Sequence, residues 1–377
     1  MVLAVGIMSG TSLDGIDTAL VEIDGVLENM TVTLVDFATM DYPEGLLQEI
    51  RRGLESQQLS MQQVSNLNFR LAEAYKEAVC QLCQKNGVVP ADLAYVASHG
   101  QTMFHQPVTE GVYGPSTLQL GDAAILAQGL GCRVVSNFRE ADLAVGGQGA
   151  PIVPFADFYC YRSADKDRIL QNIGGIGNLT WIKKGGKLSD LVAFDTGPGN
   201  MVINELTRHF YNEAYDHNGA HAARGQVKVS LVEKWLKLPY FSLPYPKTTG
   251  RELFGKPFVD QILQETADIS PEDVIASVTM LTAQSITKAA AQLTKNSCEL
   301  IVAGGGAYNP VLMEMIRQTA SKNMNVLTQE ELGFSSDAKE AVAMVILAQH
   351  TLHRLPNNVP SATGATREVI LGRITEI

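Results

Sequence analysis

The sequence predicts an α/β protein with two domains, and three observations support this prediction. The chain has 377 residues, which suits two domains of about 150 to 200 residues better than one hydrophobic core. Short apolar, β-branched segments alternate with longer segments of helical periodicity, as they do in α/β proteins. Two segments also share one plan, in which an apolar strand leads through a glycine-rich polar turn into a second apolar strand. A cleft between the domains is therefore expected.

The expected strands are the apolar, β-branched segments. They occupy residues 1–8, 18–23, 31–38, 93–98, 132–138, 168–175, 178–182, 191–197, 299–306 and 325–328. Apolar residues recur at helical spacing in four further stretches, which predict helices at 45–86, 201–213, 271–295 and 337–353. The polar segment 354–366 is expected to connect to a last strand at 368–374.

Composition and charge exclude several classes of partner. Hydrophobic residues make up 45% of the chain and charged residues 18%, the balance of a packed protein. The net charge of -11 argues against nucleic acid or an anionic membrane as the partner. The start "MVLAVGIMSG" has no basic region and predicts a strand rather than a signal peptide, and no run of about 18 apolar residues could span a membrane. A cytoplasmic location is therefore expected.

The cysteines favour reduced thiols. Five is an odd number, which does not suit a disulfide framework. Cys80 and Cys83 form a C-x-x-C pair, but no second pair at zinc-ligand spacing accompanies them. Because the surrounding periodicity is helical up to Gly87, we expect two thiols one turn apart on a helix.

The segment "GIMSGTSLDGIDTALVEID", residues 6–24, is the first of the two strand-turn-strand segments. Its glycines let the backbone approach a ligand, and consecutive N–H groups can surround phosphate oxygens. Three hydroxyl side chains can add hydrogen bonds: Ser9, Thr11 and Ser12. Asp14 and Asp17 lie where they could hold a hydrated magnesium ion, directly or through water. An ordinary Asp-Gly hairpin turn would also explain "LDGID".

The second such segment is "LQNIGGIGNLTWI", residues 170–182. Neither turn leads into a helix, whereas Rossmann and P-loop phosphate sites need a strand, a glycine turn and then a helix N-terminus. The pattern therefore disfavours both of those folds and indicates two equivalent hairpins.

The segment "AFDTGPGNMVINEL", residues 193–206, ends a strand at Asp195 and turns through Gly197. A helix is expected to begin after Asn200, which is a favourable N-cap. A carboxylate at a strand end beside a glycine turn is well placed as a general base. The alternative is that Asp195 only satisfies the turn and Asn200 only caps the helix.

Two other segments carry weaker signals for ligand contacts. "IVAGGGAYNP", residues 301–310, brings a strand to three glycines, which would let a planar group or a phosphate approach Gly304 to Gly306. "SHGQTMFHQP", residues 98–107, holds two histidines but no plausible third metal ligand. We expect this segment to be a loop whose Gln101 and Thr102 hydrogen-bond a hydroxylated ligand.

Three charged groups have both a functional and a structural interpretation. Arg139, in "NFREADLAVGGQGAP", could bind a substrate carboxylate bidentately, or form a salt bridge with Glu140 or Asp142. In the basic segment "YPKTTGREL", residues 245–253, Lys247 or Arg251 could face a phosphate. Glu340, in the first turn of an expected helix, could also merely favour the helix dipole.

The order of these features along the chain resembles that of the actin, sugar kinase and Hsp70 superfamily. The features are two glycine-rich hairpins, a strand end with an aspartate, a glycine triplet and a closing helix. Within this superfamily, the sequence resembles the 1,6-anhydro-N-acetylmuramic acid kinase family. Eight motifs in one order carry the resemblance over residues 5–373: "GIMSGTSLDGID", "SHGQT", "NFREADLAVGGQGAP", "NIGGIGN", "FDTGPGN", "KTTGRE", "AGGGAYNP" and "TGAT…LG".

The resemblance implies two ribonuclease H-like domains that close over ATP and a sugar in an active-site cleft. The N-terminal domain is expected to comprise residues 1–135 and 358–377, and the C-terminal domain residues 136–357. The first hairpin would hold ATP phosphates through Gly10, Thr11, Ser12, Leu13, Asp14, Gly15, Ile16 and Asp17, with Asp14 the residue that influences Mg²⁺. The second hairpin would do so through Asn172, Gly174, Gly175, Gly177 and Asn178. The adenosine would be bordered by Gly304, Gly305, Gly306 and Asn309.

The resemblance also implies the sugar site and the chemistry. Asp195 would be the catalytic base, and the sugar would be bound by Gln101, Thr102, Arg139, Gly197 and Glu340. In the family's reaction, water opens the 1,6 bridge of the sugar while O6 accepts the γ-phosphoryl group, giving N-acetylmuramic acid 6-phosphate and ADP in peptidoglycan recycling. The expected partner is this small sugar, and the sequence leaves a homodimer open.

Two other interpretations stay open. Another sugar or acid kinase of the superfamily would share the phosphate hairpins but differ in its substrate segments, which a substrate panel would reveal. A nucleotide-gated binding protein would use ATP to switch conformation, although the chain has no appended peptide-binding domain.

Overall fold

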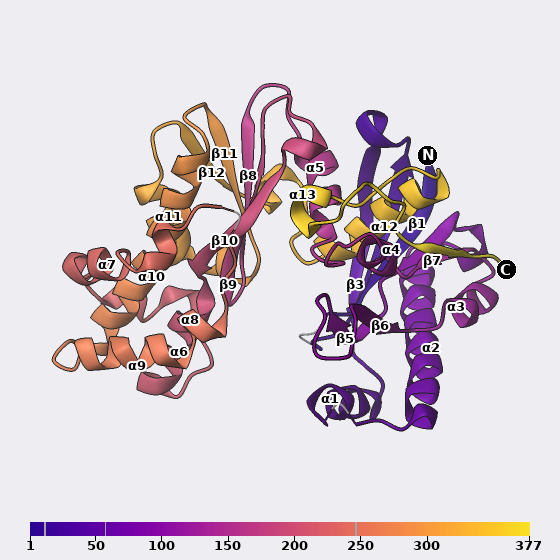
Figure 1. The fold of residues 1–377 in the computed structure, drawn as a ribbon, viewed down its shortest axis with the longest axis horizontal. Coiled ribbons are helices and arrows are strands. Elements are labelled where there is room, and N and C mark those ends of the chain that lie inside the picture. Colours follow the sequence, from indigo (N-terminus) through magenta and orange to yellow (C-terminus); the bar gives the residue numbers. More distant parts are fainter. Residues whose placement is uncertain (11–12, 57, 246) are drawn as a thin grey trace. The chain divides into compact units, whose positions relative to one another are not determined.

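The computed structural model describes residues 1–10, 13–56, 58–245 and 247–377. The chain forms two compact units, Met1–Cys160 with Asp337–Ile377, and Tyr161–Ser336. These units differ from the expected domains, since residues 136–160 and 337–357 belong with the N-terminal strands. For residues 337–357 the reason is that helix α12 (Lys339–Leu352) packs against three strands of the first unit, namely β1 (Val2–Met8), β2 (Ile16–Asp24) and β4 (Tyr95–Ser98). Figure 1 shows the gold α12 beside the indigo β1.

A six-stranded sheet forms the centre of the first unit, in the order β13-β7-β4-β1-β2-β3. Its strands are β1 (Val2–Met8), β2 (Ile16–Asp24), β3 (Thr31–Met40), β4 (Tyr95–Ser98), β7 (Val134–Ser136) and β13 (Arg373–Thr375). β2 is antiparallel to both β1 and β3, whereas β1, β4 and β7 are parallel. The separate hairpin β5 (Gln101–Gln106) and β6 (Ser116–Leu120) follows β4 in the chain.

The first unit also contains seven helices within its described residues: α1 (Leu46–Ser56), α2 (Met61–Lys85), α3 (Ala123–Leu130), α4 (Glu140–Ala144), α5 (Val153–Tyr161), α12 (Lys339–Leu352) and α13 (Pro360–Thr363). α2 begins with a capping box, in which Ser60 accepts from the Gln63 backbone and Gln63 accepts in return. Its buried residues recur at helical spacing, so one face of α2 covers the sheet.

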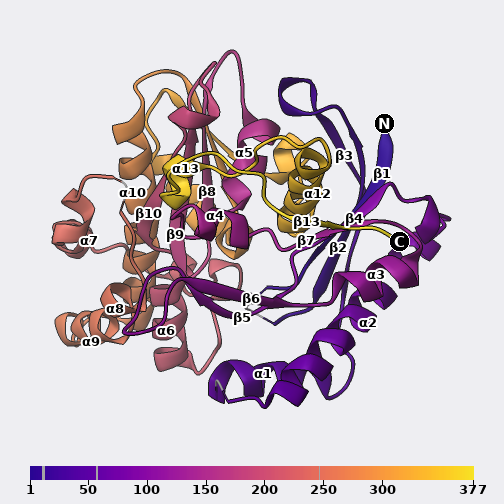
Figure 2. The same ribbon diagram turned by 45° about the vertical axis from the view of Figure 1, so that its right-hand side comes forward.

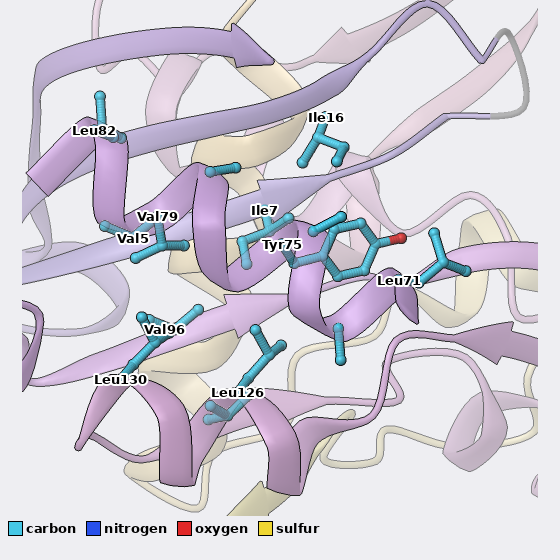
Figure 3. Close-up of a cluster of buried hydrophobic side chains, with 14 of the residues drawn as sticks. Val5, Ile7, Ile16, Leu71, Tyr75, Val79, Leu82, Val96, Leu126 and Leu130 are labelled. Atoms are coloured by element: carbon cyan, nitrogen blue, oxygen red, sulfur yellow. The ribbon is translucent and has the colours of Figure 1, made fainter. Parts of the chain in front are cut away.

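The core of the first unit lies between the sheet and helices α2 and α3. Figure 3 shows Leu71, Tyr75, Val79 and Leu82 of α2 against strand residues such as Val5, Ile7 and Val96. Each of these seven side chains is at most 1% exposed. The hydrophobic effect of this burial fixes the strands from which the first glycine-rich turn projects.

Gly6 lets α12 approach the other face of the sheet. A Cβ atom at this position would lie 1.9 Å from the Ala341 carbonyl oxygen, far inside van der Waals contact. The glycine therefore brings α12, and with it Glu340, close to β1.

Substituting Gly6 by alanine should push α12 away from β1 and lower stability by about 1 to 3 kcal/mol, the usual cost of overpacking. Thermal unfolding followed by circular dichroism measures this loss. Gly114→Ala is the matched control, because nothing lies within 4 Å of a Cβ there. Equal melting temperatures for the two variants would contradict the close approach of α12.

The second unit has a five-stranded sheet in the order β10-β9-β8-β11-β12. Its strands are β8 (Asp167–Ile173), β9 (Ile176–Ile182), β10 (Val192–Pro198), β11 (Cys298–Ala303) and β12 (Met324–Thr328). Here β9 is antiparallel to β8 and β10, and β8, β11 and β12 are parallel. The pairing repeats that of β3-β2-β1-β4-β7, so each unit has the strand order of a ribonuclease H-like core, as expected.

The helices of the second unit are α6 (Asn200–Tyr211), α7 (Val229–Trp235), α8 (Arg251–Phe254), α9 (Lys256–Glu265), α10 (Pro271–Leu293) and α11 (Pro310–Thr319), shown from a second direction in Figure 2. α10 begins with Ser270 as N-cap and Pro271 at its first position, a favourable helix start. α10 and α11 cover β8 and β11 in one apolar cluster, and α6, α7, α9 and α10 form a second cluster.

Sequence periodicity predicted most of these elements, with three corrections. All ten expected strands before residue 330 are present, but the segment expected as a loop at 98–107 forms β5, which pairs with β6. The stretch 45–86 is two helices rather than one. The last strand is limited to Arg373–Thr375, where it pairs with β7.

Cys80 and Cys83 lie on α2 with free thiols. Along the described ranges, no helix is both long and apolar enough to cross a membrane.

Candidate functional site

The first glycine-rich turn connects β1 and β2, and buried polar side chains support it. Gln101, which is fully buried, donates from Nε2 to the Gly10 carbonyl oxygen at 3.4 Å and accepts from Tyr42 OH at 3.0 Å. Ser9 Oγ lies 2.6 Å from Tyr75 OH. Leu13 has a φ of 58°, a left-handed conformation that leucine rarely adopts. Thr11 and Ser12 of the predicted phosphate site lie outside the described residues.

Carboxylates surround this turn. Asp14 is exposed. Asp17 is half-buried, and its Oδ1 accepts a hydrogen bond from Thr39 Oγ1 at 2.6 Å. Burial raises the pKa of Asp17, and the charges of Asp14 and Asp337 raise it further. The pKa of Glu340 is raised by desolvation and by Asp17 and Asp14, while Lys339 and Arg139 oppose the shift. The turn therefore lies in a negative local potential, which favours a cation.

No ready-made metal cluster accompanies these carboxylates. Among the residues that the structure describes, no three His, Cys, Asp or Glu side chains are grouped as metal ligands. One or two carboxylates are nevertheless typical of Mg²⁺ sites that are completed by water and by substrate phosphates. Asp14 fits such a site better than it fits a closed protein cage.

Arg139 lies just before α4, and neither predicted salt bridge forms. Its Nε donates to His99 Nε2 at 3.0 Å and its Nη1 donates to the Gly149 carbonyl oxygen at 2.7 Å. Within the described ranges, its guanidinium forms no hydrogen bond or ion pair with Glu140 or Asp142; only its backbone N–H donates to Glu140. Thr102, on β5, accepts from Gln119 Nε2 at 3.2 Å.

The second hairpin packs tightly on the start of α6. Its Gly174 and Gly175 carbonyl oxygens accept the N–H groups of Gly199, Asn200 and Met201 at 2.8 to 3.1 Å. A Cβ on Gly199 would lie 2.3 Å from the Gly174 oxygen. The interpretation of Asn200 as N-cap is wrong, because Gly199 is the N-cap and Asn200 is the first helical residue.

Asn200 instead ties the helix to the hairpin, since its Nδ2 donates to the Ile173 carbonyl oxygen at 3.2 Å. The remaining hairpin residues of the prediction lie on the paired strands. Asn172 is opposite Asn178, and Gly177 is opposite Gly197 of β10. The predicted phosphate hairpin and the strand of the predicted base are thus adjacent.

Asp195 is half-buried and lies at a bulge within β10, which continues to Pro198 rather than ending at Asp195 as expected. The segment before α8 holds it in place, because Thr249 N–H donates to Asp195 Oδ2 at 2.8 Å and Asp195 N–H donates to the Lys247 carbonyl oxygen at 2.9 Å. Tyr240 OH donates to the Asp195 carbonyl oxygen at 2.6 Å. No described residue donates to Oδ1. One carboxylate oxygen is therefore fixed, and the other accepts no hydrogen bond from the described residues.

The environment of Asp195 strengthens it as a base. Burial raises the pKa of this carboxyl above its ordinary 3.8 and Glu252 adds to the rise, while the Thr249 N–H group lowers it. A carboxylate with a raised pKa takes a proton more readily than one in water. The sequence singled out Asp195 and, separately, the segment 245–253, but gave no sign that this segment holds the Asp195 carboxylate.

Lys247 has a structural task that the sequence did not reveal. Its Nζ donates to the carbonyl oxygens of Tyr240 and Phe241 at 3.1 and 3.4 Å, and it lies 4.7 Å from the centre of the Tyr240 ring. These contacts hold together the segment that orients Asp195.

The glycine triplet packs on the end of β8 beside a cavity. Gly304 has a φ of 81°, and a Cβ on it would lie 2.4 Å from Asn172 Oδ1. Asn309 caps α11 by accepting from the N–H groups of Val311 and Leu312. Gly305 and Asn309 also line a cavity of about 350 Å³, together with Asn204, Tyr215 and His217.

The chain is similar to known proteins over nearly its whole length. Residues 2–376 match the family described as anhydro-N-acetylmuramic acid kinase. A protein of that name from Francisella tularensis subsp. novicida (strain U112) is 46% identical over 373 residues, 98% of this chain and 97% of the relative. One from Bacillus cereus (strain AH187) is 43% identical over 374 residues, 98% of both chains. Among solved structures, component A of the Acidaminococcus fermentans (R)-2-hydroxyglutaryl-CoA dehydratase matches with a TM-score of 0.46 and 10% identity, over 92% of this chain and 97% of the other.

Proposed function

Because the chain belongs to the anhydro-N-acetylmuramic acid kinase family, we propose that it phosphorylates O6 of 1,6-anhydro-N-acetylmuramic acid with ATP while water opens the 1,6 bridge. The products are N-acetylmuramic acid 6-phosphate and ADP. The observation that carries this proposal is Asp195, a half-buried carboxylate whose Oδ2 is fixed by Thr249 while its Oδ1 accepts no hydrogen bond from the described residues.

Asp195 is the base of the proposed reaction. It takes a proton from water as the water oxygen attacks the anomeric carbon, and the bond between C1 and O6 breaks. The released O6 then attacks the γ-phosphorus, and ADP leaves with the electrons of the broken phosphorus–oxygen bond. Because Thr249 fixes one carboxylate oxygen, the other can be directed at the water.

The two hairpins bind the phosphates of ATP in this proposal. Backbone N–H groups of the turns can surround phosphate oxygens, and the glycines leave room for them. In the second hairpin, the carbonyls of Gly174 and Gly175 are occupied by α6, so the turn is held in one conformation before ATP binds. Preorganisation of this kind accounts for much of the rate gain in phosphoryl transfer.

We propose that Asp14 holds Mg²⁺, directly or through water, with Asp17 close to it. When bound, the ion would neutralise charge on the phosphates of ATP. Burial and the charges of Asp14 and Asp337 raise the pKa of Asp17, so a cation at this turn would stabilise its ionised carboxylate. Removing divalent ions with EDTA should therefore abolish ADP release.

The cavity beside the glycine triplet is the proposed adenosine site. Gly305 leaves one wall without a side chain, and the Tyr215 and His217 rings, whose centroids are 5.9 Å apart, offer flat faces for a base. Adenine stacks on such faces without the need for charge. The cavity volume of about 350 Å³ suits a drug-sized ligand.

On the sugar, we assign the lactyl carboxylate to Arg139 and hydroxyl groups to Thr102 and Glu340. Gln101 is assigned a supporting part, because its amide is engaged by Gly10 and Tyr42. Gly197 has a φ of 132°, and a Cβ on it would lie 2.8 Å from the Phe241 ring, so glycine is required at this position, two residues after the proposed base. The proposed reaction consumes ATP and a fragment of peptidoglycan, and it belongs to cytoplasmic cell-wall recycling.

A coupled assay of ADP release tests the function. With Mg²⁺ and ATP, release should depend on 1,6-anhydro-N-acetylmuramic acid and should be much slower with glucose or with N-acetylmuramic acid. Equal rates across a panel of sugars and acids would favour another kinase of the superfamily. ADP release that no sugar stimulates would contradict the proposal and favour a nucleotide-gated binding protein.

The raised pKa of Asp195 predicts the acid limb of the pH profile. The base acts when ionised, so kcat/KM should fall as the pH drops through its folded-state pKa, at a midpoint above the ordinary 3.8. The residual activity of Asp195→Asn should lack this limb. Since Glu340 also has a raised pKa, Glu340→Gln is the control, and loss of the limb in that variant instead would assign it to Glu340.

A further inference from the structure

Arg139 is held by two neutral acceptors. The Nε–H group donates to His99 Nε2 at 3.0 Å, and one N–H of Nη1 donates to the Gly149 carbonyl oxygen at 2.7 Å. A guanidinium has five N–H donors, so one on Nη1 and two on Nη2 are left. No described residue accepts from these three. The end of the guanidinium that could grip a carboxylate with two parallel hydrogen bonds is therefore free.

The charge of Arg139 points to the same kind of ligand. Burial lowers the pKa of Arg139, and the nearby charges of Glu340 and Glu140 oppose this shift. Neither carboxylate forms an ion pair with its guanidinium within the described ranges. A buried cation without a paired anion is costly, and a substrate carboxylate would offset that cost.

His99 can serve as an acceptor because of its own surroundings. The ring is 3% exposed, and its Nδ1 lies 2.7 Å from the Gly100 carbonyl oxygen. A carbonyl only accepts, so Nδ1 carries the hydrogen and Nε2 offers its lone pair to Arg139. Burial and the charge of Arg139 lower the pKa of His99 to about 3, which keeps the ring neutral and in this tautomer at neutral pH.

The second acceptor is fixed independently. Gly149 N–H donates to Asp142 Oδ2 at 2.8 Å, and the fully buried Asp142 accepts at Oδ1 from Asn358 Nδ2 and Thr363 Oγ1, both at 2.9 Å. This carboxylate joins the segment after α4 to the C-terminal segment. With Gly149 held this way, the remaining freedom of the Arg139 guanidinium is set by His99.

We propose that His99 is a positioning residue, which orients the Arg139 guanidinium so that its free end binds the carboxylate of the substrate. The inference rests on the proposed function for the identity of that substrate. His99 does not contact the sugar in this account. It acts through Arg139 alone, and its effect should appear as affinity for the carboxylate rather than as the rate of phosphoryl transfer.

Two substitutions of His99 separate the role of Nε2, which accepts from Arg139, from that of Nδ1, which donates to Gly100. In His99→Asn, the amide can still donate to Gly100 but has no group at the position of Nε2, whereas the longer His99→Gln can place an oxygen there. We expect H99N to raise the KM for 1,6-anhydro-N-acetylmuramic acid by about 10- to 100-fold, the usual value of a hydrogen bond to a charged group. The KM for ATP and kcat should change little, and H99Q should restore most of the affinity.

His350→Asn is the matched control. His350 is also fully buried, and its Nδ1 lies 2.8 Å from the Ile346 carbonyl oxygen while its Nε2 accepts from Leu27 N–H at 3.1 Å. This variant should share any general loss of stability but not the rise in KM. Equal KM values in H99N and H350N would overturn the proposal.

Two further readouts distinguish this proposal from the proposed function. In an Arg139→Ala background, H99N should not raise the KM further, and with 1,6-anhydro-N-acetylglucosamine, which lacks the carboxylate, it should have no effect. An undiminished effect in either case would overturn the positioning role.

If the wild type does not turn over the sugar at all, the proposed function fails. The contact is then judged by the unfolding free energies of H99N, R139A and the double variant, where additive losses would contradict it.

Discussion

Asparagine in place of Asp195 is expected to lower kcat by about 10²- to 10⁴-fold, the range contributed by a general base, with little change in the affinities for ATP and sugar. An amide oxygen can still accept from Thr249 N–H, which fixes Asp195 Oδ2 at 2.8 Å in the native protein, so the geometry should persist. Only the capacity to take a proton is removed. Steady-state kinetics and isothermal titration calorimetry measure the two effects separately.

The control for this variant is Asp190→Asn. Asp190 lies shortly before β10 and accepts from Lys187 N–H at 3.0 Å, and it has no place in the proposed chemistry. Its kcat should equal that of the wild type. Near-normal turnover by Asp195→Asn would remove Asp195 from the role of base, and a large loss of sugar affinity would make it a binding residue instead.

The second large effect is expected from Arg139→Ala, which should raise the KM for the sugar by about 10- to 150-fold and change kcat much less. Charge-assisted hydrogen bonds contribute about 1.5 to 3 kcal/mol, which converts to this range. The guanidinium has free donors and no paired carboxylate among the described residues. A lysine at this position should rescue little, because a point charge cannot form two parallel hydrogen bonds.

Arg133→Ala is a suitable control, because Arg133 lies just before β7 and its nearest carboxylate is the exposed Glu376 at 3.7 Å. This variant should leave the KM for the sugar unchanged. An unchanged KM in Arg139→Ala would instead assign Arg139 a structural task, namely to join His99 to Gly149.

Local patterns in the sequence predicted the strands and the two hairpins well, because runs of apolar, β-branched residues are typical of buried strands. They failed where a contact distant in the chain decides the structure. Asn200 has the chemistry of an N-cap, yet the Gly174 and Gly175 carbonyls satisfy the first N–H groups of α6 in its place. Likewise, no local signal separates β5 from a loop, because its pairing with β6 spans the intervening turn.

In the candidate site too, local patterns predicted some features and contacts distant in the chain decided others. Spacing and resemblance singled out Asp195 and the glycines, and the roles assigned to them stay predictions. The contacts that hold the site in place, such as those of Thr249, His99 and Asp142, could not be predicted because the partners are far away in the sequence. Asp142, for example, accepts from Thr363, and only the folded chain brings these residues together.

The central claim is that water opens the sugar bridge in the same reaction that phosphorylates O6. The most direct measurement is turnover of ATP and 1,6-anhydro-N-acetylmuramic acid in ¹⁸O-labelled water, with mass analysis of products quenched before the anomeric oxygen exchanges. The account predicts one ¹⁸O at C1 of the sugar, an unlabelled 6-phosphate and one ADP per sugar. Label in inorganic phosphate without a phosphorylated sugar, or a phosphorylated sugar that carries no label at C1, would contradict it.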